Sequence, residues 1–492
     1  MIAATPHVHA SQLKLLLSDI AQVSDLEDRA VTGVTTDSRR VTRGDVFIAI
    51  PGSADDGRDY IDSAVQQGAI AVVCEGTGFS ARPCSVPVYA VMNLRARLGR
   101  LANQFFGIPS ERLRVVGVTG TNGKTTYTHL MAQALHKLGL RCGMIGTPGV
   151  GFLGHLTATP LTTPDVITLH GMLAQLAQAG AEFVCLEVSS HALDQARVSG
   201  VTFDTAVFTN LSHDHLDYHG DMERYARAKS QLFKIARLQH AVINVDADLG
   251  AELADNTTAE SVWTYGLASH ADVYPDACDL RLDGMAMHVA TPRGNIVVAS
   301  RLIGRVNVPN VLAVVATLLA FGHDPATVQS AVNDLVPVPG RMELFNAPTF
   351  PAVVVDYAHT PDALEKALES LREHCRCRLW CVFGCGGDRD QEKRPQMGRI
   401  AERHADRVIL TDDNPRHEDP GSIVAAIQSG MQHPSTVIHG RASAIHWAIT
   451  SAQATDIVLI AGKGHETKQL VGDRIIPLDD RALVIEALSQ KA

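Results

Sequence analysis

The chain has 492 residues, of which 46% are apolar and 20% are charged, and its formal net charge is −10. This length exceeds one ordinary hydrophobic core, so two to four domains are expected. The acidic balance argues against binding to nucleic-acid phosphates, and no apolar stretch approaches the roughly 18 residues of a membrane span.

The N-terminal stretch MIAATPHVHASQLKLLLSDI lacks the basic start, the long apolar run and the cleavage site of a signal peptide. We therefore expect a cytoplasmic protein. Nine cysteines, an odd number, disfavour a disulfide framework in a chain of this kind. Cys375, Cys377, Cys381 and Cys385 cluster without a CxxC pair, so structural thiols are favoured over a zinc site.

The chain divides into three segments by its apolar pattern. Residues 1–95 mix turns with short apolar runs such as VFIAIPG and AIAVVCEG, and two short helices are predicted over 11–20 and 60–67. From about residue 110, continuous apolar runs alternate with helix-length amphipathic stretches; these runs are LRVVGVTG, EFVCLEVSS, TAVFTNLS and HAVINVDA. A second series follows the Pro/Gly-rich segment VPVPGR, and it comprises AVVVDYAH, LWCVFGCGG, RVILTDDNP and IVLIAGKGHE.

Such runs are typical of parallel strands buried on both faces, so both later segments are predicted to be doubly wound α/β domains. The expected domains are 1–95, 96–338 and 339–492. Nearly every predicted strand ends in a polar or glycine-rich cluster. Because ligands bind beyond the carboxyl ends of strands in open α/β sheets, we expect a reaction between the second and third domains.

The segment GVTGTNGKTT follows the strand LRVVGV and opens an amphipathic helix over 125–138. Glycines let backbone amides approach phosphate oxygens, Lys124 can neutralise the β- and γ-phosphates, and the Thr125 hydroxyl can bind Mg²⁺. The strict GxxxxGK[ST] pattern requires glycine where this chain has Val118. The candidate nucleotide-binding residues are Gly120, Thr121, Asn122, Gly123, Lys124, Thr125 and Thr126. Motors, GTPases, kinases and ligases share such a loop, so it does not fix the reaction.

A carboxylate ends the next predicted strand. Glu187 in EFVCLEV is placed to hold Mg²⁺, and His191 could add a second ligand. The segment NLSHDHLDYH then brings three histidines and two aspartates together without HExxH spacing, which favours a polar active-site loop over zinc. Lys229 follows on the next predicted helix, in AKSQL.

The segments GVTGTNGKTT, EVSSHAL, NLSHDHLDYHG, GRVNVPN, PGRME, DYAHTPDAL, GCGGDRD and DNPR occur in this order. Together they resemble the Mur ligase family of peptidoglycan synthesis, over essentially the whole chain. The resemblance implies a uridine-nucleotide domain, a central ATPase domain and a Rossmann-like domain for an amino acid. It also implies ATP, Mg²⁺ and an acyl-phosphate intermediate that an amine converts to an amide, in a cytoplasmic monomer acting on small molecules.

The resemblance assigns roles to individual residues. Lys124, Lys229 and His215 are the catalytic candidates, and Lys229 matches a lysine that is carbamylated in the family, which would make it an oxygen ligand for a second Mg²⁺ near His215. The metal candidates are Thr125, Glu187, His215 and carbamylated Lys229. Residues that match the ATP base and hinge region are Asn307, Asn310, Arg341, Asp356 and His359. Residues that match the site for the UDP-linked muramoyl peptide are Ser38, Thr162, Thr163, Ser189, Gln195 and Arg197. Arg305 and Pro309 lie where the pattern is looser, which leaves the role of Arg305 open.

The amino-acid substrate is indicated by the DNPR motif. A turn arginine is well suited to a carboxylate, and a glutamate can pair with an ammonium, so Arg416 and Glu466 match the two charges at the distal centre of meso-diaminopimelate. Lysine lacks that carboxylate and would leave Arg416 unpaired. The candidate residues for this substrate are Arg389, Asp413, Asn414, Pro415, Arg416, Gly462 and Glu466. The co-substrate implied is UDP-N-acetylmuramoyl-L-alanyl-D-glutamate.

Three alternatives stay open on the sequence. A lysine-adding homologue or a ligase like folylpolyglutamate synthetase would share the nucleotide site, although the DNPR motif argues against both. A P-loop motor or switch would not need GCGGDRD and DNPR in a separate domain. Phosphate release that requires both an acid substrate and an amino acid would separate a ligase from a motor.

Overall fold

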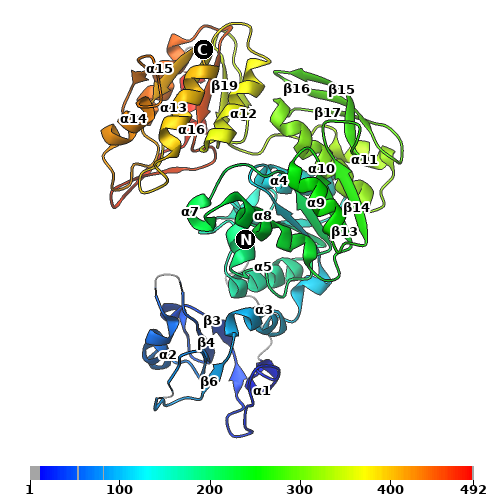
Figure 1. Cartoon of the computed structure of the whole chain (residues 1–492), viewed down its shortest axis with the longest axis vertical. Helices are drawn as coiled ribbons and strands as arrows, with labels where there is room; N and C mark the ends of the chain where they lie inside the picture. The colour runs from blue at the N-terminus through cyan, green and yellow to red at the C-terminus, as the bar shows by residue number, and fades with distance from the viewer. Residues whose placement is uncertain (1–10, 53–54, 81, 490–492) are drawn as a thin grey trace.

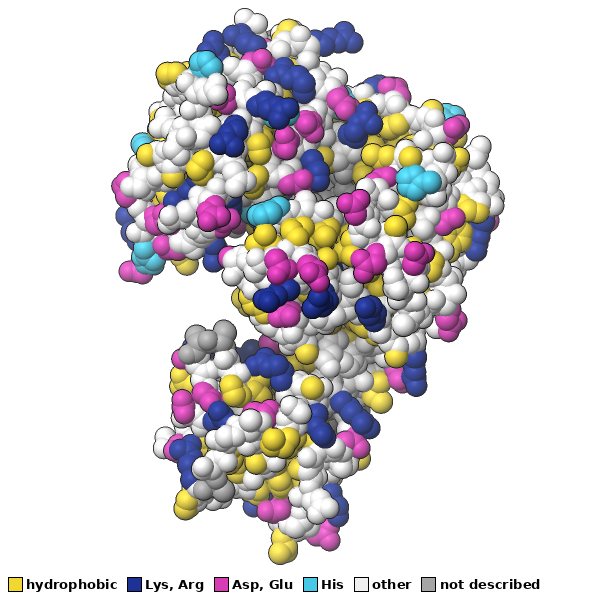
Figure 2. Space-filling view, in the orientation of Figure 1, with side chains coloured by type: hydrophobic (Ala, Val, Ile, Leu, Met, Phe, Trp, Pro, Cys, Tyr) yellow, Lys and Arg dark blue, Asp and Glu magenta, His cyan; other side chains and the backbone are white. Residues whose placement is uncertain are grey.

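The computed structural model describes residues 11–52, 55–80 and 82–489, and these form three α/β bodies arranged along the long axis of the molecule (Figure 1). Each body is built around its own parallel or mostly parallel sheet. The predicted fold class is therefore confirmed. The N-terminal body is joined to the rest by a narrower neck (Figure 2).

The N-terminal body has a four-stranded parallel sheet and a small two-stranded sheet. In spatial order the larger sheet is β3 (Gly33–Thr35), β4 (Asp45–Ala49), β5 (Ala71–Glu75) and β6 (Val88–Val91). The smaller sheet is β1 (Ser11–Gln12) and β2 (Ala30–Val31), and the helices are α1 (Leu13–Leu16), α2 (Ile61–Gln66) and α3 (Leu94–Phe105). Helix α3 packs in one apolar cluster with the N-terminal sheet and with Val166 and Ile167 of the central body.

One predicted helix is wrong in extent. The helix expected over 11–20 is reduced to the single turn of α1, because Ser11 and Gln12 pair as a strand with Val31 and Ala30. Leu13, Leu16 and Leu17 are buried, so the apolar spacing that suggested a longer helix belongs to one turn and its cap. The helix expected over 60–67 is present as α2.

The central body contains an eight-stranded sheet with a parallel core. Its spatial order is β10 (His155–Thr157), β9 (Gly149–Phe152), β8 (Cys142–Gly146), β11 (Phe183–Glu187), β7 (Arg114–Thr119), β12 (Thr205–Phe208), β13 (His240–Asn244) and β14 (Ser261–Tyr265). The four central apolar runs predicted as strands are β7, β11, β12 and β13. The antiparallel β9–β10 hairpin has no continuous apolar run and escaped prediction.

Helices cover both faces of this sheet. One apolar cluster packs it against α4 (Lys124–Lys137), α10 (Val308–Ala320) and α11 (Pro325–Val332). The other cluster includes α5 (Val166–Gln178), α6 (Ser190–Asp194) and α9 (Asp248–Asn256). A three-stranded antiparallel sheet joins the first cluster, and its strands are β15 (Tyr274–Arg281), β16 (Gly284–Ala290) and β17 (Ile296–Ser300). The remaining helices are α7 (Leu216–His219) and α8 (Met222–Ser230).

The C-terminal body has a six-stranded sheet that is parallel except at one edge. Its order is β18 (Glu343–Phe345), β19 (Ala352–Asp356), β23 (Ile457–Ala461), β20 (Leu379–Phe383), β21 (Arg407–Leu410) and β22 (Thr436–Val437). One face is covered by α12 (Pro361–Arg372), α13 (Lys393–His404) and α14 (Pro420–Gln428), and the other by α15 (Arg441–Ser451) and α16 (Asp480–Ser489). A hairpin of β24 (Lys468–Val471) and β25 (Arg474–Pro477) completes it.

The strand ends place the candidate residues. Strand β7 leads directly into the phosphate loop, and β11 ends at Glu187. In the C-terminal body, β19, β20, β21 and β23 lead into DYAH, GCGG, DNPR and AGKGHE, respectively. On the face in Figure 2, charges of both signs are interspersed. Within 11–52, 55–80 and 82–489, no helix has the length and apolar character needed to cross a bilayer.

Candidate active site

The phosphate loop connects β7 to α4 through two glycines in the left-handed region. Gly120 and Gly123 have φ angles of 148° and 87°. A Cβ atom on Gly120 would lie 1.9 Å from Oγ1 of Thr209, and one on Gly123 would lie 2.6 Å from Oδ1 of Asn310. Only glycine therefore permits the tight entry into α4 that lets a helix N-terminus accept an anion.

Two lysines converge on one carbonyl oxygen of this loop. Lys124 Nζ donates to the carbonyl oxygens of Gly120 and Thr121, both at 2.8 Å, and Lys229 Nζ donates to the same Gly120 oxygen at 2.8 Å. Burial lowers the pKa of Lys124, while Glu187 and Asp214 oppose that effect. The Lys124 amine at the N-terminus of α4, together with the dipole of that helix, creates a site suited to a polyanion.

Glu187 and Thr125 form an oxygen-rich cluster beside the loop. Glu187 is buried, and its carboxylate accepts hydrogen bonds from Thr125 Oγ1 at 3.0 Å and from the amide and hydroxyl of Thr147 at 3.1 and 3.0 Å. Burial raises the pKa of Glu187, and the charges of Lys124 and Arg341 oppose that effect. A hydroxyl and a carboxylate in contact are the hard oxygen donors that Mg²⁺ prefers, so these residues fit that ion.

Lys229 lies at the end of α8 with only 1% of its surface exposed. Its Nζ is 4.3 Å from the centroid of the Tyr225 ring. Burial, together with the charge of Lys124, lowers the pKa of Lys229 well below the usual value for lysine. The neutral amine is the nucleophilic form, so this environment favours reaction with an electrophile such as carbon dioxide.

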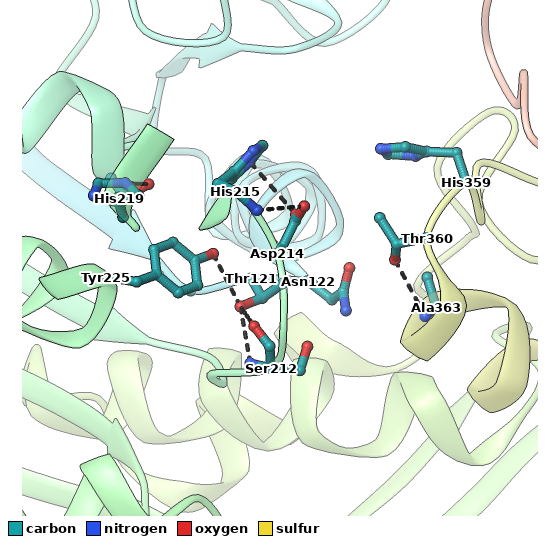
Figure 3. A network of polar contacts seen from close by, with 12 residues as sticks. Thr121, Asn122, Ser212, Asp214, His215, His219, Tyr225, His359, Thr360 and Ala363 are labelled. Carbon is teal, nitrogen blue, oxygen red and sulfur yellow. Dashed lines mark hydrogen bonds and ion pairs between the residues drawn. The ribbon is translucent and has the colours of Figure 1, made fainter. Parts of the chain in front are cut away.

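His215 lies beside Asp214, and His219 and Tyr225 are in the same region, so imidazole rings gather here (Figure 3). His215 has a φ of 55°, and its Nε2 is 3.4 Å from Oδ2 of Asp214. Burial lowers the pKa of His215, and Asp214 partly opposes this. The ring of His191 is 4.9 Å from that of His215 and 4.2 Å from that of Tyr218, so His191 belongs to this group of rings.

A cavity of about 510 Å³ lies between the central and C-terminal bodies. Its walls come from the phosphate loop, from the ends of β13 and β14, from the start of α10, and from α12. All the residues predicted for the ATP base and hinge region line it, namely Asn307, Asn310, Arg341, Asp356 and His359.

Arg341 connects this cavity to the metal-site candidates. Its guanidinium lies 4.2 Å from the Tyr357 ring centroid, and Nη2 is 3.4 Å from Thr125 Oγ1. Asp356 accepts the backbone amides of Met342 and Ala358 at 2.7 and 2.8 Å, which fixes the chain where the C-terminal body begins. The arginine is thus directed toward the phosphate end of the cavity.

The residues predicted for the muramoyl peptide fall in two places. Thr163 Oγ1 donates to the Glu187 carbonyl at 2.7 Å and contacts Ser189 Oγ at 3.3 Å, and Arg197 Nη1 donates to the Thr163 carbonyl at 3.1 Å. Gln195 accepts from Arg197 at 2.9 Å, and Thr162 bonds to Thr147, which also binds Glu187. These five predicted residues therefore form one surface beside Glu187. Ser38 lies apart, buried in the N-terminal body.

The residues predicted for the amino acid come together from three strand ends of the C-terminal body. Arg416 has a φ of 51° and donates from Nη1 to the Gly387 carbonyl at 2.6 Å. A Cβ atom added to Gly386 would lie 2.9 Å from that Nη1 and 3.8 Å from Cγ of Arg389, so both arginines flank one glycine. Arg389 also lines a cavity of about 460 Å³ with Asp217, Asp388, Asp390, Gln391 and Glu418.

An anionic group lies behind the same turn. Asn414 Nδ2 donates to Glu466 Oε2 at 3.0 Å. Asp413 is buried, and a Cβ atom on Gly462 would lie 2.7 Å from its Oδ2, so glycine is required there. Pro415 completes the turn. The site therefore presents two guanidinium groups and a held carboxylate, which suits a ligand that carries both charges.

Comparison with known proteins agrees with this geometry. Models of three Mur ligase regions match the chain: the family catalytic domain over residues 30–106, the middle domain over 118–318, and the glutamate ligase domain over 340–464. A Chromobacterium violaceum protein named UDP-N-acetylmuramoyl-L-alanyl-D-glutamate–2,6-diaminopimelate ligase is 49% identical over 463 residues, which cover 93% of this chain and 94% of that protein. The chain belongs to the Mur ligase family.

Further Mur ligases give the same result. A Coxiella burnetii protein of the same name is 46% identical, over 94% of this chain and 97% of its own. A solved structure of a 2,6-diaminopimelate ligase has a TM-score of 0.71 and 38% identity, covering 98% of this chain and 99% of its own. Mycobacterium tuberculosis folylpolyglutamate synthase shares the fold, with a TM-score of 0.63 at 20% identity over 75% of this chain and 92% of its own.

Lys463 of this Mur ligase also belongs to the group of residues at the amino-acid site, although it was not predicted from the sequence. Its side chain is fully buried, and Nζ donates to Asn414 Oδ1 at 3.0 Å and to Glu466 Oε2 at 2.9 Å. It thus holds two of the predicted amino-acid residues together. The signal was present in the segment AGKGHE, where a lysine separates the glycine and glutamate that were predicted.

Arg305, whose role the sequence left open, lines the cavity between the central and C-terminal bodies of this Mur ligase and bonds from Nε to Glu373 Oε1 of the C-terminal body at 2.8 Å. The cysteine cluster is divided between two environments. Cys381 and Cys385 are buried on β20 and just beyond it, whereas Cys377 is exposed.

Proposed function

We propose that this chain joins meso-diaminopimelate to UDP-N-acetylmuramoyl-L-alanyl-D-glutamate through an amide bond, with conversion of ATP to ADP and phosphate. The observation that carries the proposal is the charge arrangement at the amino-acid site. Arg416 and Arg389 flank Gly386, and Glu466 is held by Asn414 and Lys463. A carboxylate and an ammonium on one distal carbon match these two groups, and the names of the similar ligases support the same substrates.

The chemistry proceeds in two steps. A carboxylate oxygen of the acid substrate attacks the γ-phosphorus of ATP, the bond to the ADP oxygen breaks, and an acyl phosphate forms. The amine of the amino acid then attacks the acyl carbon, loses a proton and expels phosphate. The first step brings a carboxylate anion against the polyanion ATP, and the second brings an amine against the acyl phosphate. Positioning and charge neutralisation are therefore the main contributions of the protein.

Residues of this chain supply those contributions. Lys124, which bonds to the loop carbonyls, would neutralise the β- and γ-phosphates of bound ATP. Arg341, which contacts Thr125 from the cavity side, would add a second positive charge. Thr125 and Glu187 would hold a Mg²⁺ ion, which when bound supplies positive charge to the phosphate oxygens. Thr162, Thr163, Ser189, Gln195 and Arg197 position the peptide end of the acid substrate, and Ser38 serves its uridine end in the N-terminal body.

Lys229 is proposed to react with carbon dioxide to give a carbamate. Its amine nitrogen forms a bond to the carbon atom, and the released proton passes to solvent. The burial that lowers the pKa of Lys229 supports this step, because it increases the neutral amine. The carbamate oxygens and His215 would then hold a second Mg²⁺ ion. We infer that the enzyme acts as a monomer, since all these candidates lie on one chain. We also propose that it works in the cytoplasm.

The test is an omission assay on the purified protein. ADP formation is measured with ATP, Mg²⁺, the UDP-linked dipeptide and meso-diaminopimelate, and then with each component left out in turn. The proposal expects ADP to form at full rate only when both the acid and the amino acid are present. Rapid ADP formation without either acceptor would indicate a motor or switch and would refute the ligase.

A further inference from the structure

Helix α12 forms one wall of the nucleotide cavity and touches the central body at both of its ends. The cavity is lined on this side by Ala363, Lys366, Ala367, Glu369, Ser370 and Glu373. At the far end, Glu373 pairs with Arg305 at 2.8 Å, and Ser370 Oγ accepts the amide of Val306 at 3.3 Å. At the near end, a single carboxylate, Asp362, reaches the phosphate loop.

Asp362 lies in the first turn of α12, directly after the Thr360 cap and Pro361. Its Oδ2 accepts from Asn122 Nδ2 at 2.9 Å and from Ser212 Oγ at 2.8 Å, and Lys366 Nζ lies 2.9 Å from Oδ1. Asn122 belongs to the phosphate loop, and Ser212 precedes Asp214 and His215. The side-chain carboxylate of Asp362, in the C-terminal body, therefore bonds to both segments that surround the phosphate site.

These two segments are also bonded to each other (Figure 3). Thr121 Oγ1 donates to the Ser212 carbonyl at 3.2 Å and accepts the Ser212 amide at 3.0 Å. The same hydroxyl is 3.1 Å from the Tyr225 hydroxyl, and the Tyr225 ring lies against Lys229. A continuous polar path thus runs from α12 of the C-terminal body to the buried lysine.

We propose that Asp362 is a positioning residue that fixes the phosphate loop and the Ser212 segment from the C-terminal body, so that phosphoryl transfer depends on this contact between the two bodies. This inference rests on the proposed function and deepens it. The carboxylate holds both segments in one arrangement around the phosphate site, and such positioning lowers the barrier to phosphoryl transfer.

The first experiment compares Asp362→Ala with Asp362→Asn by steady-state kinetics on the full chain. Asp362→Ala removes both acceptor contacts, so kcat is expected to fall at least tenfold, or about 1.4 kcal/mol. The KM for ATP should change less than about threefold, which corresponds to less than about 0.7 kcal/mol. Asp362→Asn keeps an acceptor oxygen and should recover part of kcat.

A matched control uses the same replacement at another helix start. Asp324 caps α11 and bonds within its own turn to the amide and hydroxyl of Thr327. Asp324→Asn should therefore retain the wild-type kcat. Thermal unfolding of each variant checks folding, and Asp362→Asn remains informative if Asp362→Ala fails to fold.

A double-variant cycle separates positioning from a general structural effect. Asn122→Ala and Asp362→Ala remove opposite ends of one hydrogen bond, so the double variant should lose little more kcat than the worse single variant. Losses that multiply, or an Asp362→Ala kcat within twofold of wild type, would overturn the inference. Failure of the wild-type chain to make product from meso-diaminopimelate would instead refute the proposed function.

Discussion

The phosphate region and the amino-acid region are built in different ways. Around the phosphate loop, Lys229 is buried and Lys124 is half-buried, and both are bonded to the loop's own carbonyl. In the C-terminal body, Arg416 is held through a backbone carbonyl and a left-handed turn, while Glu466 depends on Asn414 from another strand end and on Lys463 from its own segment. The phosphate region places its charged groups at one strand–helix junction, whereas the amino-acid region brings charged groups together from separate strand ends.

This difference teaches which changes should be catastrophic and which should be selective. Losing the Lys124 cation of the phosphate region leaves transferring charge uncompensated for every substrate. Losing one charge in the amino-acid region affects only the ligand that needs it. The two regions should therefore separate in kinetics, with kcat sensitive to the first and the amino-acid KM sensitive to the second.

The largest effect is expected for Lys124→Ala. Removing the cation that would face the β- and γ-phosphates should lower the rate of ADP formation at least about a hundredfold with saturating substrates. Lys137→Ala, at the last turn of the same helix, is the control and should keep its rate. Retention of more than about a tenth of the wild-type rate would show that the phosphate region does not depend on Lys124.

Lys229→Ala should be nearly inactive, and short-chain carboxylates should restore part of the activity because they replace the carbamate oxygens. Intact-protein mass measurement in bicarbonate would detect the carbamate on the wild-type chain. Lys234→Ala, an exposed lysine just beyond α8, is the control. A Lys229→Ala variant that remains fully active would remove this lysine from the metal site.

Arg416→Ala should act on the second region only. Each lost charged hydrogen bond is worth about 1.5–3 kcal/mol, so the KM for meso-diaminopimelate should rise at least about tenfold. The KM for ATP should change little, and discrimination against lysine should shrink. Arg474→Ala, on the exposed neighbouring hairpin, is the control. An unchanged meso-diaminopimelate KM, or a selective loss of ATP affinity, would contradict the role of the DNPR turn.

The smallest effect is a pH shift in Lys463→Met. Burial raises the pKa of Glu466, but the charge and hydrogen bonds of Lys463 and Asn414 outweigh it, so that pKa lies below the ordinary value. Without Lys463 the pKa of Glu466 rises, so on acidification the carboxylate becomes protonated at a higher pH than in the wild-type chain. The acid limb of kcat/KM for meso-diaminopimelate should therefore move to higher pH. A profile that keeps its acid limb would show that Lys463 does not support Glu466.

The contrast between the regions also explains what the sequence could predict. The phosphate loop is one contiguous segment after a buried strand, so Gly120, Gly123 and Lys124 could be assigned a function by residue type and spacing alone. The amino-acid site is drawn from segments near 386, 414 and 463, and its assignment needed the family resemblance. Asp362 was missed because its role depends on long-range packing that no local pattern encodes, whereas Lys463 was left unassigned although it lies within the AGKGHE segment.

The fold shows the same limit. Continuous apolar runs identified parallel strands such as β7, β11 and β23, because burial on both faces leaves a direct trace in composition, whereas the parallel strands β8 and β14 were not predicted. The helix expected over 11–20 was wrong in extent, because pairing of Ser11 and Gln12 with a distant strand overrides the local apolar spacing. The hairpin of β9 and β10 is rich in glycine and carries little β signal of its own.

The most direct measurement of the central claim is the mass of the product formed in competition. The wild-type chain is incubated with ATP, Mg²⁺, the UDP-linked dipeptide and equal concentrations of meso-diaminopimelate and lysine, and the muramoyl tripeptide is analysed by mass spectrometry. The account predicts a product whose added mass is that of meso-diaminopimelate minus water, with the lysine adduct a minor species. A predominant lysine adduct, or no peptide product beside ADP, would contradict it.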